Sequence, residues 1–157
     1  GLKLDGLASS NANTLDDYEE GVFSPTIQCQ SGTITVDTTP PQSGQCRYTK
    51  IGREVFLRGG ILFSAISSPS GWTRINGLPF TSDAAGAGNS ENRNWGMFSA
   101  HNTASDVDPG TTSGVIYENN AYGYMLTEGT TAGTAWDASL VDTGTELMFM
   151  GHYTANA

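Results

Sequence analysis

The chain has 157 residues, enough for one domain with its own core and too few for two ordinary domains. It carries 16 Asp and Glu against 7 Lys and Arg, so its formal net charge is −9, and the cations are scattered along the chain. Nucleic acid is therefore excluded as a partner, since binding phosphates needs clustered basic residues. No apolar stretch approaches the roughly 20 residues that span a bilayer, so membrane insertion is not expected.

Residues 1–21 are predicted to be a linker from an upstream domain that ends in a short helical turn. Residues 1–13 are mostly small and polar and have no usable period. Thr14 can cap a helix, acidic residues follow in its first turn, and Gly21 can end it. The four carboxylates of this segment also suit a cation site, but a capped, solvated turn is the preferred interpretation. Because the chain does not begin with Met, we expect it to be part of a longer protein.

Residues 22–157 are predicted to form one β domain, because glycines and small polar residues interrupt every apolar run after a few positions. Within one long run, Gly59-Gly60 predicts a bulge or a sharp bend. The expected strands are Thr26–Gln30, Thr33–Asp37, Gln45–Lys50, Arg53–Ser67, Trp72–Gly77, Trp95–His101, Gly114–Glu118, Tyr122–Glu128 and Thr145–Tyr153.

Two further segments complete the expected architecture. Residues 81–94 are rich in Gly, Ala, Ser and Asn and are predicted to be a long exposed loop. The last strand, Thr145–Tyr153, is partly apolar on both faces, so it should lie between the core and a second sheet or a neighbouring subunit. We predict an all-β fold, an antiparallel, jelly-roll-like β-sandwich of roughly eight to ten strands.

Cys29 and Cys46 are the only cysteines and flank a segment with a Pro40-Pro41 turn. They are a candidate disulfide at the base of a hairpin, but spacing alone does not bring their Cα atoms into bonding range. A free pair fits a reducing cytosol equally well. A metal site is not expected from two cysteines without supporting ligands.

Four segments resemble the C-terminal domains of bacteriophage tail fibre and tail spike proteins. Residues 13–26 read NTLDDYEEGVFSPT, similar to a "TLDDYEEGTWTPT" signature of that family. In the same order follow RYTKIGREV at 47–55, INGLPF at 75–80 and GHYTA at 151–155. The likeness covers the two ends and the first half, while residues 81–140 match only in general character. The resemblance implies a virion protein made in the bacterial host cytoplasm, a homotrimer and an upstream fibre or spike domain.

No recognisable catalytic constellation accompanies the two histidines, His101 and His152. Neither a nucleophile elbow nor a carboxylate pair in a marked setting is present, so the chain is not expected to be an enzyme. Asp106 and Asp108 precede Pro109-Gly110, so a turn is the preferred interpretation of these residues over a Ca²⁺ site. No cofactor or metal is expected.

Of the functions considered, glycan binding has the clearest candidate residues in the sequence. Proteins hold sugars with aromatic faces beside amide and charged groups. Two clusters have this composition, and two further tryptophans lie near turns. The candidate receptor-binding residues are Arg93, Asn94 and Trp95, then Tyr117, Asn119 and Tyr122, and finally Trp72 and Trp136.

The leading hypothesis is a fibre-tip module that binds a host-surface glycan or outer-membrane protein without covalent chemistry. Threefold repetition would give weak single sites useful avidity. The alternatives are a purely structural trimerisation or folding cap, a capsid-decorating or head-fibre protein, and, least favoured, a polysaccharide hydrolase.

Overall fold

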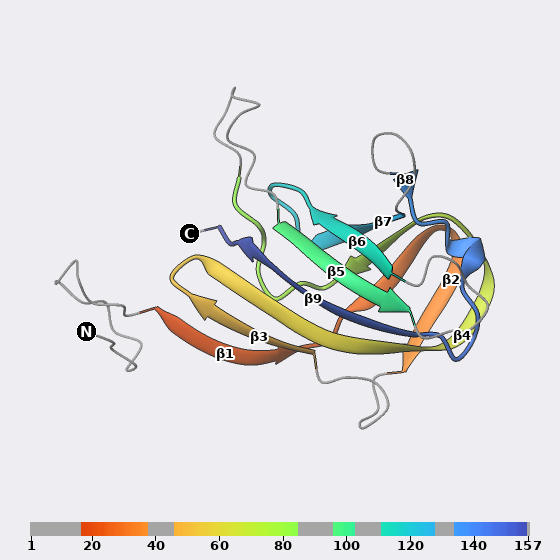
Figure 1. Ribbon diagram of the computed structural model, residues 1–157, viewed down its shortest axis with the longest axis horizontal. Coiled ribbons are helices and arrows are strands. Elements are labelled where there is room, and N and C mark those ends of the chain that lie inside the picture. The colour runs from red at the N-terminus through yellow and green to blue at the C-terminus, as the bar shows by residue number, and fades with distance from the viewer. Residues whose placement is uncertain (1–16, 38–45, 85–95, 103–110, 128–133, 157) are drawn as a thin grey trace, which may run out of the picture.

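The computed structural model describes residues 17–37, 46–84, 96–102, 111–127 and 134–156 (Figure 1). These residues form nine strands and one short 3-10 helix, η1 (Ala138–Leu140). The strands are β1 (Tyr18–Phe23), β2 (Thr26–Asp37), β3 (Cys46–Ile51), β4 (Glu54–Asn76), β5 (Gly96–Asn102), β6 (Thr111–Ile116), β7 (Tyr122–Thr127), β8 (Thr134–Ala135) and β9 (Glu146–Thr154). Among the described residues, no helix has the length and apolar character that crossing a membrane requires.

The predicted all-β, antiparallel fold is confirmed, and its two layers share the long strand β4. The first half of β4 pairs with β3 and β9, and its second half pairs with β2 and β7. The front layer has the order β1-β3-β4-β9-β5-β6, and the back layer holds β2, the second half of β4 and β7 (Figure 1). Because β6 also pairs with β7, the hydrogen-bonded path from β4 through β9, β5, β6 and β7 returns to β4.

The core lies between the layers and follows the alternation that the sequence predicts. In β4, Val55, Leu57, Ile61 and Phe63 are buried, while Phe56, Arg58 and Ser64 on the opposite parity are exposed. In β9, Leu147, Phe149 and Tyr153 point inward in the same manner.

The Gly59-Gly60 pair is not a bulge, and it marks the place where β4 changes its neighbour on one edge. The register with β9 runs without a break from Glu54 to Leu62. On the other edge, pairing with β3 stops at Arg58 and pairing with β2 starts at Leu62. A Cβ on Gly59 would lie 2.3 Å from Cys46 Sγ, so glycine is required there for close packing.

The pairing of β4 with β2 has three register shifts further along the strand, and they explain why four predicted strands are two: pairing continues across each irregularity. Gly32 of β2 lies opposite two residues of β4, Ser68 and Pro69, since Ser31 pairs with Ser70 and Thr33 with Ser67. Gly32 has a φ of 78°, and a Cβ there would lie 2.3 Å from the Ser68 carbonyl oxygen. A bulge of this kind absorbs an extra residue without ending the pairing.

The predicted helical turn before Gly21 is wrong for the described residues, because residues 18–23 form strand β1. These residues pair with β3 in continuous register, from Tyr18 opposite Ile51 to Phe23 opposite Cys46. Pairing with β3 provides hydrogen-bond partners for the backbone groups along one edge of the whole segment, which a single capped turn does not. Residues 1–16, including Thr14 and the rest of the predicted linker, lie outside the described residues.

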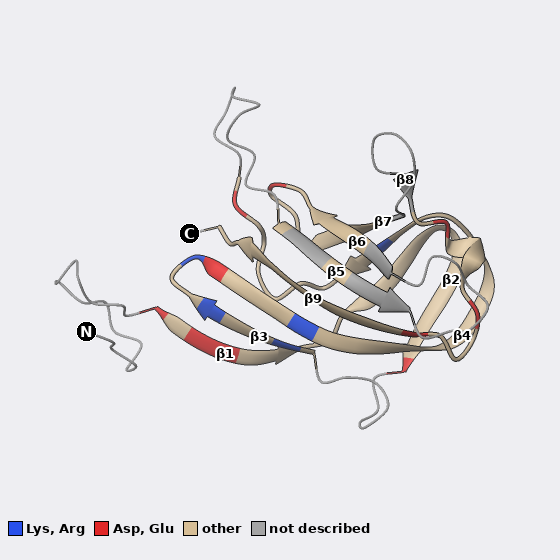
Figure 2. Cartoon of the chain, in the orientation of Figure 1, with Lys and Arg blue, Asp and Glu red and all other residues tan. Residues whose placement is uncertain are grey.

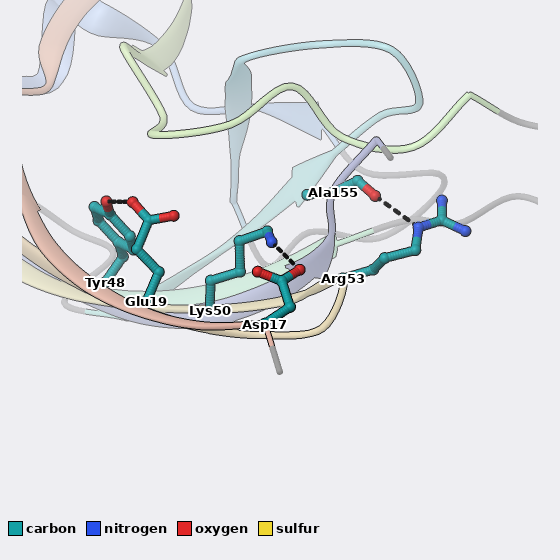
Figure 3. Close-up of polar contacts among 6 residues, drawn as sticks. All are labelled: Asp17, Glu19, Tyr48, Lys50, Arg53 and Ala155. Atoms are coloured by element: carbon teal, nitrogen blue, oxygen red, sulfur yellow. Dashed lines mark hydrogen bonds and ion pairs between the residues drawn. The ribbon is translucent and has the colours of Figure 1, made fainter. Parts of the chain in front are cut away.

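Side-chain contacts join the acidic residues in and just before β1 to residues of β3 (Figure 3). Lys50 forms an ion pair with Asp17, and the Tyr48 hydroxyl donates a hydrogen bond to Glu19. This hydrogen bond to a carboxylate raises the pKa of Tyr48. The acids therefore serve strand pairing, and no three His, Cys, Asp or Glu side chains of the described residues come together to hold a metal ion.

The Leu78-Pro79-Phe80 segment is held against the core. Leu78 is buried, and the Tyr153 hydroxyl donates to the Phe80 carbonyl oxygen at 2.8 Å and accepts from the Phe80 N–H at 3.1 Å. Burial raises the pKa of Tyr153 to about 12. The beginning of the predicted 81–94 loop is also held, since Ser82 pairs with Ala155 and Arg53 forms an ion pair with Asp83.

Both cysteines are buried free thiols. Cys29 lies in β2 opposite Thr73 of β4, whereas Cys46 begins β3 and packs on Gly59. The Cys46 thiol lies 3.7 Å from the Gly60 carbonyl oxygen, and burial raises its pKa to about 11. Of the two alternatives that the sequence leaves open, the structure has the free pair.

We predict that Gly59→Ala lowers the free energy of unfolding by about 1–3 kcal/mol, because its Cβ would overlap the Cys46 side chain in a packed core. Gly60→Ala is the matched control, since its Cβ would meet nothing closer than Glu146 Oε1 at 3.5 Å. Urea denaturation of both variants measures the difference. Equal stability of the two variants would contradict the packing role of Gly59.

We also predict two titratable thiols per unfolded chain in the absence of reductant, and very slow reaction of Cys46 in the folded chain at pH 8. Cys46 has no exposed surface, and its pKa of about 11 keeps the reactive thiolate scarce. As the pH rises above the ordinary thiol pKa, the unfolded chain ionises first, so Cys46 lowers stability between about pH 9 and 11. An intact mass lower by two hydrogens would instead indicate a disulfide.

Candidate functional site

Three of the predicted glycan-binding residues meet on the outer surface of the back layer. Trp72 lies in β4, Tyr122 in β7, and Tyr117 follows β6. A further tyrosine, Tyr124 of β7, links them, with ring centroids 5.8 Å from Trp72, 5.6 Å from Tyr122 and 6.0 Å from Tyr117. All four rings are partly exposed, and we call them, with the polar side chains described next, the aromatic patch.

An arginine lies between two of these rings. The Arg74 guanidinium carbon is 4.1 Å from the centroid of the Tyr122 ring and 5.0 Å from that of the Trp72 ring. A cation over aromatic faces is attracted by the ring quadrupole, most strongly where water is partly excluded. The guanidinium therefore holds Trp72 and Tyr122 in fixed positions on the surface.

Two amide side chains complete the aromatic patch. Arg74 Nη2 and Nε donate to Gln28 Oε1 at 2.6 and 3.0 Å, and Asn76 Nδ2 donates to the same oxygen at 2.9 Å. Gln28 itself is exposed. The register places Gln28, Arg74 and Tyr124 in one row across β2, β4 and β7, with Asn76 and Tyr122 in the next row.

The patch follows from simple strand alternation. Trp72, Arg74 and Asn76 share one parity in β4, while Thr73 and Ile75 on the other parity are buried. In β7, Tyr122 and Tyr124 alternate with Gly123 and Met125, both of which face the core. Gln28 was missed by sequence reasoning because its strand neighbour in β4 is 46 residues away.

Arg74, Asn76 and Tyr124 were also missed, although the sequence holds a signal for them. Arg74 and Tyr124 lie two residues after the candidates Trp72 and Tyr122, and Asn76 lies two residues after Arg74. Positions i and i+2 of a strand share a face. Extending each candidate along its strand would have found them.

Trp136 is wrong as a ligand platform, because it is fully buried in the core. Its backbone N–H donates to the Met125 carbonyl oxygen at 2.9 Å, which holds the residue after β8 against β7. Asn119 is exposed in the turn between β6 and β7 with a φ of 59°, a left-handed conformation that asparagine tolerates well.

For the other residues that the sequence singles out, the structure gives either no placement or a position outside the back layer. Arg93, Asn94 and Trp95 lie outside the described residues, as do Asp106 and Asp108. His152 is exposed on β9 in the front layer, with Nδ1 3.7 Å from Glu54 Oε2 and its ring 6.1 Å from that of Phe56. For His101, the backbone belongs to β5, and its side chain lies outside the described part of the chain.

The aromatic patch can bind a ring with C–H groups on one face and hydroxyls at its edge. Partly exposed aromatic rings provide the apolar contact, and the Gln28, Arg74 and Asn76 side chains provide hydrogen-bonding groups beside it. The residues of the patch include neither a carboxylate nor a histidine.

Comparison with known proteins finds a solved structure with a similar fold. No protein-family model and no curated protein sequence matches the chain. Among solved structures, the chain is similar to the crystal structure of Dettilon tailspike protein, with a TM-score of 0.61 and 18% sequence identity. The likeness covers 87% of this chain and 24% of that chain, so this chain spans about a quarter of the tailspike's length. At this identity the likeness establishes a shared fold.

Proposed function

We propose that this chain is a module of a bacteriophage tail fibre or tail spike that binds a host-surface glycan through the aromatic patch. The observation that carries the proposal is the fixed group of Trp72, Arg74 and Tyr122 on the outer surface of the back layer. The virion location rests on the four resembling sequence segments and on the fold shared with a tailspike protein.

The chemistry of the patch favours saccharides over other small ligands. Stacked sugar rings need a flat apolar surface that water leaves easily, and bidentate polar groups at its edge read the hydroxyls. The Arg74 guanidinium would also pair with a carboxylate of an acidic sugar. A glycan is therefore proposed ahead of a protein receptor, and binding is proposed to be non-enzymatic.

The module is further proposed to be a homotrimer joined to an upstream fibre or spike domain. Three copies of a shallow site would bind a repeating surface polysaccharide with avidity, since each further contact becomes intramolecular. The exposed apolar side chains of the front layer favour a second candidate role, a structural cap that holds copies together and binds no receptor.

We predict that Trp72→Ala and Tyr122→Ala each weaken glycan binding about tenfold or more, which corresponds to ~1.4 kcal/mol. An array of bacterial surface glycans, probed with the wild-type chain, identifies the ligand, and titration of that glycan measures the affinities. Tyr18→Ala is the matched control, because Tyr18 is an exposed aromatic residue of β1 in the front layer.

Two results would contradict the proposal. Wild-type affinity in both patch variants would exclude the aromatic patch as the receptor site. Failure of the wild-type chain to bind any glycan or host cell would favour the structural cap.

A further inference from the structure

The outer surface of the front layer exposes large apolar side chains that the proposed glycan site does not use. Val22 of β1 is 62% exposed, Phe56 of β4 48%, and Met148 and Met150 of β9 43% and 64%. We call these four residues the apolar face. Phe56, Met148 and Met150 each alternate with buried residues along their strands, and Val22 precedes Phe23, which packs partly buried against the core. The exposure therefore follows from strand parity and not from a local irregularity. Contiguous exposed patches of this kind mark interaction sites in soluble proteins.

Strand register brings the four side chains together. One row of directly paired residues crosses β1, β3, β4 and β9: Val22, Arg47, Arg58 and Met150. Phe56 lies one row to one side of it, and Met148 lies one row to the other side. A groove of about 620 Å³ runs along this surface and is lined by Phe56, Arg58 and Met150, among others.

The charges around the apolar face are nearly balanced, unlike those of the whole chain. Figure 2 shows acidic and basic positions on neighbouring strands of this layer. Its outer side carries the guanidinium groups of Arg47 and Arg58 and three carboxylates, those of Glu20, Glu54 and Glu146. The chain as a whole has a net charge of −9, so charge repulsion between two copies would be weaker at this surface than the net charge suggests.

The composition also suits contact between copies. Arginine, phenylalanine and methionine are enriched in protein interfaces, whereas an aspartate- and glutamate-rich surface is not. Because this surface carries both positive and negative side chains, the arginines of one copy can face the glutamates of an identical copy. A shallow groove then receives apolar side chains of the neighbouring copy.

We infer that the apolar face is the surface through which copies of this chain associate. The inference rests on the proposed homo-oligomer and deepens it, since it names both the partner and the contacting surface. It also separates the two outer surfaces of the sandwich by role, with the front layer facing other copies and the back layer facing the receptor.

Oxidation of methionines in the wild-type chain tests the inference without any substitution. Peroxide oxidises exposed methionines, and peptide mass analysis gives a rate for each one. Met125 is fully buried and serves as the internal control. In the assembled chain, whose mass is checked by sedimentation, Met148 and Met150 are expected to oxidise as slowly as Met125, and dilution to the monomer is expected to release both.

Three results would overturn the inference. One is a monomer at every concentration with freely oxidised Met148 and Met150. Another is an assembled chain in which both oxidise freely, since the contact then lies elsewhere. The third is a monomer in which both are protected, since another part of the chain then covers the face.

A substitution gives a second readout. Met150→Glu is expected to sediment as a single chain, because it places a carboxylate in the contact, while its circular dichroism stays that of a folded β protein. Leu140→Glu is the matched control: Leu140 is 42% exposed on η1, away from the face, so assembly should persist. Retained assembly in Met150→Glu would contradict the inference.

The two proposals fail separately. If Met150→Glu is monomeric and still binds the identified glycan weakly, both stand. If no glycan binds while assembly depends on the apolar face, the receptor role fails and the association surface stands. If Trp72→Ala loses glycan binding and Met150→Glu remains assembled, the receptor role stands and the association surface fails.

Discussion

The fold depends on β4, whose 23 residues are hydrogen-bonded to four other strands. A strand of this length can serve two layers only if it curves from one to the other, as β4 does at the end of the sandwich beside η1 (Figure 1). Gly59 permits close packing where the neighbour of β4 changes from β3 to β2, because Cys46 occupies the space that a Cβ would need. The thiol is buried in the same contact, so one close packing interaction fixes the start of β3 against β4.

The curve of β4 between the layers also determines which side chains the two outer surfaces present. Residues before it, such as Phe56, point outward on the front layer together with Met150 of β9. Residues after it, such as Trp72 and Arg74, point outward on the back layer beside Tyr122. A single strand thus supplies side chains to an apolar surface and to an aromatic, hydrogen-bonding surface, and the outward parity is the same in both.

Alternation in the sequence predicted most strands, because side-chain period is a local property. It failed at β1, because acidic residues suit the start of a helix equally well. Only the pairing with β3 decides that these residues form a strand. It also failed to show that Trp136 is buried, since a tryptophan in a short segment has no period. The aromatic patch was predicted in part: Trp72, Tyr117 and Tyr122 were named, but Gln28 joins them only through a strand pairing with residues 46 positions away.

The claim that the back layer binds a saccharide is tested most directly by nuclear magnetic resonance. Backbone and side-chain signals of the labelled chain would be followed during titration with an oligosaccharide released from the host surface polysaccharide. The account predicts that the largest shifts occur at Gln28, Trp72, Arg74 and Tyr122. Shifts confined to β1, β3 and the front-layer half of β4 would contradict it, as would saturating binding that leaves the Trp72 indole signal unchanged.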